Sequence, residues 1–135
     1  MRGIVADANV DGHVEWLVKR IVASDWLEYW NHIGIALEVF ANVGLVDLSP
    51  DPQVWRTCQR EQLVLITANR NRDGPDSLEA TIQSEGTEES LPVLTFADAD
   101  RILRSNDYAD RVVAKLIEYL IDIDDFRGTG RLYLP

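Results

Sequence analysis

Short apolar runs alternate with amphipathic segments along the chain, and this alternation constrains the fold more than any other feature. The runs have the length and composition of buried strands, and the segments between them carry apolar residues at helical spacing. The strand candidates are Gly3–Ala6, Ile35–Phe40, Leu63–Ile66 and Leu91–Phe96, with a weaker candidate at 131–135. This order predicts an α/β fold, a three-layer α/β/α arrangement with a mainly parallel central sheet.

The chain is expected to form one domain over residues 1–135. Its 135 residues match the size of a single domain. No internal repeat and no linker rich in Gly, Pro or Ser divides it.

Charge and cysteine content exclude several classes of protein. Thirteen Lys and Arg against 23 Asp and Glu give a formal net charge of -10, which argues against a polybasic arm for DNA or membranes. The single cysteine, Cys58, excludes an internal disulfide framework and a multi-cysteine zinc site. The first residues do not have the pattern of a signal peptide, and no apolar segment is long enough to span a bilayer. We therefore expect a cytoplasmic protein without membrane association.

Polar residues gather directly after each strand candidate. They are Asp7 and Asn9 after the first, Asp47 to Asp51 after the second, Asn69 to Asp73 after the third, and Asp98 and Asp100 after the fourth. In open parallel sheets, ligands bind beyond the carboxyl ends of the strands. The sequence therefore predicts the functional site at that edge.

The same polar segments carry a resemblance to a known family. The matching motifs are Asp7-Ala8-Asn9, Gly34, Gly44-Leu45, Asp51 to Trp55, and Val64 to Asn71. Their order and spacing over residues 3 to 96 resemble the PIN-like domains, a fold of metal-dependent ribonucleases that includes the toxins of toxin–antitoxin pairs. The resemblance implies a hydrolase that uses Mg²⁺ or Mn²⁺ to cleave RNA.

The resemblance also assigns roles to particular residues. The implied catalytic residues are Asp7, Asp51, Asn69 and Asp73, of which Asp7, Asp51 and Asp73 would hold the metal; Asn9, Thr67, Arg70 and Asn71 would contact substrate. No other cofactor is implied. A cation at such carboxylates polarises a phosphodiester and lowers the pKa of a bound water that attacks it.

The sequence departs from the family pattern at three positions. Ala8, Asn69 and Asn71 stand where family members have acids. An asparagine offers an oxygen but no charge and weakens the binding of a hard cation. A second hypothesis is therefore a PIN-like domain that has lost catalysis and serves as a binding or regulatory module.

Simpler explanations exist for the same residues. Asp51 before Pro52 is typical of a helix N-cap, and residues 69–74 have an ordinary turn composition. A response-regulator receiver would need an aspartate where the third strand ends, and Asn69 stands there. The nuclease and binding-module hypotheses separate on one feature: whether Asp7, Asp51 and a third acid converge within about 5 Å. The candidates for the third acid are Asp73, Asp76, Glu79 and Asp98.

The expected partners follow from the same reasoning. RNA is the implied substrate, and the resemblance adds a protein partner of antitoxin type. Trp26 and Trp30 lie four residues apart, and the segment from Tyr108 to Ile123 has a wide apolar face. Such surfaces are typical of a core or a dimer face, so a homodimer is expected.

Overall fold

Five parallel strands form the centre of the molecule in a computed structural model that describes residues 1–135. The strands are β1 (Gly3–Ala6), β2 (Ala36–Glu38), β3 (Leu63–Thr67), β4 (Val93–Phe96) and β5 (Arg131–Leu134). Their order in the sheet is β2-β1-β3-β4-β5, and every neighbouring pair is parallel. The predicted α/β class and parallel sheet are confirmed, and the weak candidate at the end of the chain is a full strand of the sheet.

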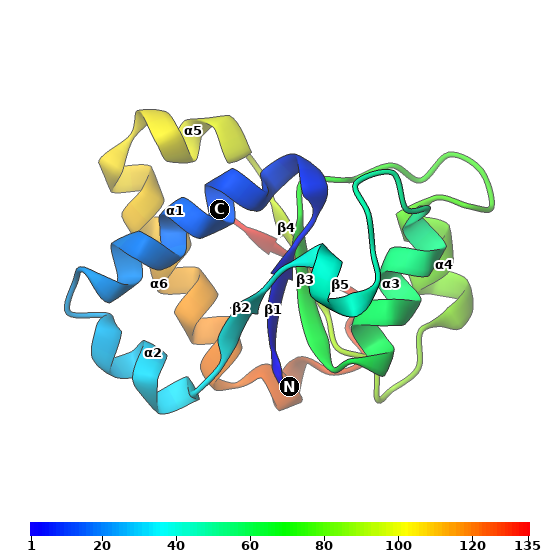
Figure 1. The fold of residues 1–135 in the computed structure, drawn as a ribbon, viewed down its shortest axis with the longest axis horizontal. Coiled ribbons are helices and arrows are strands. Elements are labelled where there is room, and N and C mark those ends of the chain that lie inside the picture. The colour runs from blue at the N-terminus through cyan, green and yellow to red at the C-terminus, as the bar shows by residue number, and fades with distance from the viewer.

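Helices cover both faces of this sheet. They are α1 (Asp11–Val22), α2 (Leu27–Ile33), α3 (Asp51–Arg60), α4 (Leu78–Glu85), α5 (Ala99–Arg104) and α6 (Asn106–Ile121), with short 3₁₀ turns η1 (Ala8–Val10), η2 (Phe40–Val43) and η3 (Ile123–Phe126). Figure 1 shows α1, α2, α5 and α6 on one side of the sheet and α3 and α4 on the other. The three-layer arrangement predicted from the sequence is therefore present.

The two faces of the sheet bury separate apolar clusters. The larger cluster joins α1, α2, α5 and α6 to the sheet through side chains such as Leu17, Ile66 and Leu116. The smaller one joins α3 and α4 to the opposite face through Trp55, Leu65 and others. Residues of β3 alternate between the clusters, as the two-residue period of a strand requires. Because both faces are buried, β3 reads as an unbroken apolar run.

Local chemistry accounts for where several elements begin and end. Gly34 ends α2 with a φ of 70°, a left-handed conformation that glycine adopts without strain. Gly3 opens β1 where a Cβ atom would lie 2.6 Å from the carbonyl oxygen of Ala36, so only glycine allows β2 to pair this closely.

No helix is long and apolar enough to cross a bilayer.

Candidate functional site

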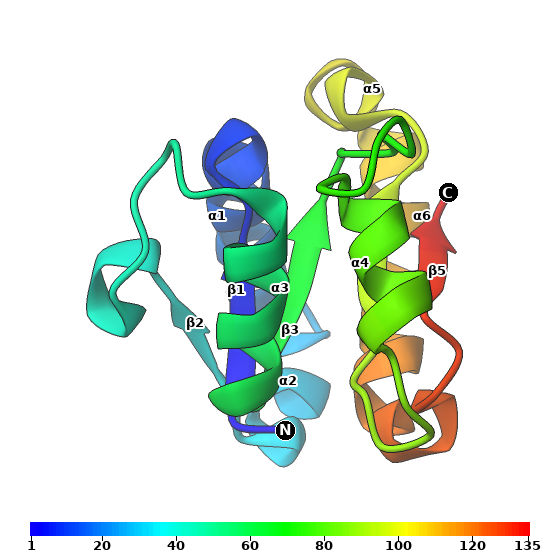
Figure 2. The same cartoon turned by 90° about the vertical axis from the view of Figure 1, so that its right-hand side faces the viewer.

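The order of the strands places a topological switch between β1 and β3. The chain passes from β1 to β2 on one side and then returns to add β3 on the other side of β1. In open α/β sheets, ligands bind beyond the carboxyl ends of the strands at such a switch. Figure 2 shows the carboxyl end of β3 and the loop that follows it at the upper edge of the sheet. The site predicted from sequence is at this edge.

Asp7, the residue directly after β1, is held by two hydrogen bonds. Its Oδ1 accepts from the backbone N–H of Ala8 at 2.9 Å. Its Oδ2 accepts from the hydroxyl of Thr67 at 2.7 Å. Thr67 is the last residue of β3 and is fully buried, so it fixes the carboxylate against a rigid part of the sheet.

The same hydroxyl connects Asp7 to the loop after β3. Thr67 Oγ1 accepts from the backbone N–H of Asn69 at 2.9 Å, and the side-chain amide of Asn69 donates to Asp51 Oδ2 at 3.0 Å. Asp7, Thr67, Asn69 and Asp51 therefore form one hydrogen-bonded network, which we call the Asp7–Asp51 network. It connects the carboxyl ends of β1 and β3 to the first residue of α3, and all four residues belong to the site that the resemblance implies.

Asp51 does not cap its helix. It is the first residue of α3, and the N-cap position belongs to Pro50, which offers no side-chain hydrogen bond. The prediction that Asp51 is an N-cap is therefore wrong by one position. Because its carboxylate is not needed by the backbone N–H groups of α3, it is available to Asn69 and to a ligand.

The loop after β3 is built by asparagine side chains. Asn69 Oδ1 accepts from the backbone N–H of Asn71 at 2.9 Å, and Asn71 Oδ1 accepts from that of Asp73 at 3.0 Å. This use of side chains to turn the backbone is typical of asparagine. It accounts for Asn71 as a structural residue of the loop.

The remaining predicted residues do not bond to either acid of the network. Asn9, Asn71 and Asp73 are exposed, and their side chains make no hydrogen bond to Asp7 or Asp51. Arg70 donates from Nη2 to the carbonyl oxygen of Ala97 at 3.2 Å, which places it beside the end of β4. No three side chains of Asp, Glu, His or Cys form a group that could hold a metal ion.

Arg131, at the start of β5, belongs to this region and was missed in the sequence. Its Nη1 donates at 2.8 Å both to the carbonyl oxygen of Asn69 and to Thr95 Oγ1. Its Nε pairs with Glu79 Oε2 at 2.9 Å. Only 7% of the Arg131 side chain is exposed. Glu79, one of the acids considered for the metal, is therefore paired with Arg131.

One signal in the sequence points to Arg131. It is a lone arginine opening an apolar strand candidate, and a buried arginine requires acceptors. Its partners are far away in the chain, at Glu79, Asn69 and Thr95, and no local pattern connects them.

The field of the Asp7 carboxylate reaches a thiol on α3. Burial, and to a smaller extent the negative charge of Asp7, raises the pKa of Cys58 to about 12. The thiol is therefore protonated at neutral pH and does not act as a nucleophile. Cys58 is a free, buried cysteine.

The donor atoms of the Asp7–Asp51 network fit a hard divalent cation. They comprise two carboxylates and a hydroxyl, all oxygen donors, and Mg²⁺ sites in proteins often use one or two carboxylates and otherwise water and phosphate oxygens. A carboxylate has about four lone-pair positions. Asp7 uses two of them within the protein and Asp51 one, so both retain capacity for a cation.

Comparison of the chain with protein-family models, with curated proteins and with solved structures finds no match.

Proposed function

We propose that the chain is a divalent-cation-dependent nuclease that acts on RNA. The observation that carries this proposal is the hydrogen-bonded Asp7–Asp51 network at the switch between β1 and β3. Two acids that lie 44 positions apart in the chain are brought into one network at the edge where such sheets bind ligands. The PIN-like resemblance supplies the reaction class.

Each residue of the network has a distinct part in this function. Asp7 and Asp51 would hold Mg²⁺ or Mn²⁺, which polarises a phosphodiester and lowers the pKa of a bound water. Thr67 orients Asp7 by donating its hydroxyl proton. Asn69 orients Asp51 through its amide. Arg70, exposed in the loop after β3, is available to pair with a phosphate oxygen of the RNA.

The test is cleavage of a mixed single-stranded RNA with Mn²⁺ or Mg²⁺, by the wild type and by Asp7→Asn. The substitution keeps the shape of the side chain and removes its charge, so we expect a loss of at least about 100-fold in rate. Asp125→Asn is the matched control, because Asp125 is exposed on η3, before β5 and so at the opposite end of the sheet. It should cleave as the wild type does.

Two results would contradict the proposal. Equal cleavage by the wild type and Asp7→Asn would mean that the activity comes from elsewhere. No cleavage by the wild type with either metal would remove the nuclease from consideration.

The second candidate is a PIN-like binding or regulatory module without catalysis. Two observations favour it. No third acid joins Asp7 and Asp51 in a metal-binding group, and the candidate Glu79 is paired with Arg131. The amide of Asn69 donates to Asp51, so a neutral donor takes the place of an acid that would attract a cation. Folded wild type that neither cleaves RNA nor binds Mn²⁺ would support this candidate. A protein partner of antitoxin type and a homodimer stay predictions from the sequence.

A further inference from the structure

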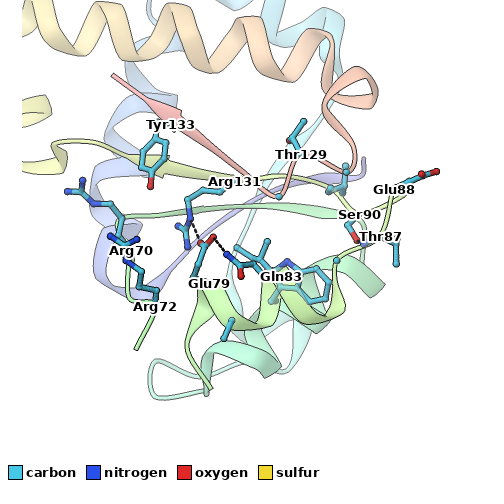
Figure 3. A pocket seen from close by; sticks show the side chains of 17 residues that line it. Arg70, Arg72, Glu79, Gln83, Thr87, Glu88, Ser90, Thr129, Arg131 and Tyr133 are labelled. Atoms are coloured by element: carbon cyan, nitrogen blue, oxygen red, sulfur yellow. Dashed lines mark hydrogen bonds and ion pairs between the residues drawn. The ribbon is translucent and has the colours of Figure 1, made fainter. Parts of the chain in front are cut away.

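A large hollow lies between α4 and β5, next to the Asp7–Asp51 network. Its volume is about 1090 Å³, which is at the upper end for small-molecule sites. Residues of α4, the loop from Gly86 to Leu91 and β5 line it, and Arg70 and Arg72 reach it from the loop after β3. Figure 3 shows these side chains around the opening.

One buried cation in the wall of this hollow has unused donors. Three acceptors pair with Nε and Nη1 of Arg131: Glu79, Asn69 and Thr95. Its Nη2 is buried and has no hydrogen-bond partner. The side chain as a whole is only 7% exposed. An unpaired donor on a buried charged group costs free energy. Because Nη2 exposes less than 1 Å², a small shift of the lining side chains must accompany binding; an acceptor that then reaches Nη2 from the hollow removes that cost.

Two further arginines add to the positive charge. Arg70 and Arg72 are exposed and line the same hollow as Arg131. Glu79 and Glu88 lie in the lining too, and Glu79 is already paired with Arg131. Three arginines thus face two acids, in a chain whose overall net charge is -10. The lining therefore carries one more positive than negative charge.

We propose that the hollow binds a phosphate-bearing anion, with Arg131 as its buried anchor and Arg70 and Arg72 at its rim. Arginine presents paired N–H groups that match the oxygens of a phosphate. A dianion gains more than a carboxylate from several cations, because each attraction scales with the charge of the ligand. Free phosphate and the phosphate of a nucleotide share this chemistry.

The site is distinct from the Asp7–Asp51 network in what it requires. Binding at Arg131 needs neither a divalent cation nor the carboxylate of Asp7. The inference therefore does not depend on nuclease activity.

The experiment is a titration of ¹⁵N-labelled protein with inorganic phosphate at constant ionic strength, followed by NMR. We expect saturable shifts at the backbone amides of Gly128 and Gly130, which line the hollow, and at Nε of Arg131. Acetate at the same concentrations should bind at least about tenfold more weakly. Adenosine 5′-monophosphate binding more tightly than phosphate would identify a nucleotide site, and equal affinities a site for free phosphate.

Variants locate the binding. Arg131→Gln, and separately the double variant Arg70→Gln with Arg72→Gln, should each lose about tenfold in affinity, the equivalent of one charge-assisted hydrogen bond. The double variant changes only exposed side chains, so it decides the question even if Arg131→Gln does not fold. Arg104→Gln, an exposed arginine that does not line the hollow, is the control for the loss of one positive charge, and Arg104→Gln with Arg111→Gln is the control for the loss of two.

Phosphate binding and RNA cleavage are tested independently, so one proposal can fail while the other holds. Asp7→Asn should bind phosphate as the wild type does, whether or not the protein cleaves RNA. Shifts that fail to saturate, that acetate reproduces, or that survive unchanged in the double variant would overturn the inference.

Discussion

Asn69 uses both ends of its side chain in the loop after β3. Its amide nitrogen donates to Asp51, and its amide oxygen accepts from the backbone N–H of Asn71. A carboxylate at this position would keep the second hydrogen bond and lose the first. Compared with an aspartate, Asn69 therefore lowers the affinity of the site for a cation and stabilises the loop when no cation is bound.

The variant Asn69→Asp measures this exchange. It sets a second carboxylate against Asp51, where the present contact is 3.0 Å, so without metal we expect a loss of about 1–3 kcal/mol in the free energy of unfolding. Mn²⁺ should raise the Tm of the variant more than that of the wild type, because a ligand stabilises the state that binds it. Thermal melts with and without Mn²⁺ test this.

Asn71→Asp is the control for the added charge, since Asn71 is exposed in the same loop and does not contact Asp51. Equal Mn²⁺ shifts for the wild type and Asn69→Asp would show that position 69 does not govern the binding of a cation.

Cys58 predicts a loss of stability at alkaline pH. Its pKa is raised from 9.0 to about 12 in the folded protein, so the stability that it contributes is fully present below pH 9. It is lost as the pH rises from about 9 to about 12, because the unfolded chain releases the thiol proton first. Between these limits the loss approaches about 1.4 kcal/mol per pH unit.

Urea unfolding of the wild type and of Cys58→Ala at pH 8 and pH 10 measures the stability that the Cys58 thiol contributes. The tyrosines and lysines are the same in both proteins, so their effect cancels in the difference. The stability difference between the two proteins should shrink at the higher pH. A difference that does not change with pH would contradict the assignment.

At the scale of the elements, side-chain caps define the helices that cover the sheet. Ser77, Asp98 and Ser105 accept hydrogen bonds from the first turns of α4, α5 and α6 respectively. These caps are visible in the sequence because a small polar residue precedes each helical pattern. At α5, for example, Asp98 Oδ1 accepts from the backbone N–H of Arg101.

Ser105 offers a direct measurement of one cap. Its hydroxyl oxygen accepts from the backbone N–H of Tyr108 at 3.2 Å, so Ser105→Ala should lower the free energy of unfolding by about 1 kcal/mol. Ser105→Asp, which retains an acceptor, should remain close to the wild type. Chemical denaturation checks both, and equal stability of the alanine and aspartate variants would contradict the role of the cap.

The elements and the site were predictable to different degrees. β3 and α6 carry strong local patterns, and both are present near the expected positions. The resemblance grouped Asp7, Asp51, Asn69 and Thr67 in one site, but no spacing in the sequence states that Thr67 and Asn69 connect the two acids by hydrogen bonds. Arg131 lay outside the prediction because its acceptors come from three other elements or loops, brought together by the order of the strands.

At the scale of the whole molecule, the acidic charge opposes the folded state. A formal net charge of -10 on one domain produces self-repulsion that salt screens. Salt also weakens the ion pairs, but most of these are partly or largely exposed, and such pairs contribute little. We therefore expect the screening of repulsion to dominate.

Thermal melts should show this as a Tm that rises by about 2–5 °C between about 10 mM and 150 mM NaCl, over which the Debye length falls from about 30 Å to 8 Å. Replacing Asp122 and Asp125, both exposed, with lysine reduces the net charge and should flatten the dependence. A Tm that falls with salt would mean that ion pairs outweigh the repulsion.

The hydrogen bond from Arg131 to the carbonyl oxygen of Asn69 has a consequence for the timing of biosynthesis. The two residues are 62 positions apart. At a translation rate of about 5–20 residues per second, roughly 3–12 s pass between their additions to the nascent chain. During that interval the loop after β3 lacks the partner that ties it to the last strand, and the hollow has no buried cation. The two acids at the switch point are synthesised well before the arginine beside them, so the region reaches its final charge balance only when β5 joins the sheet.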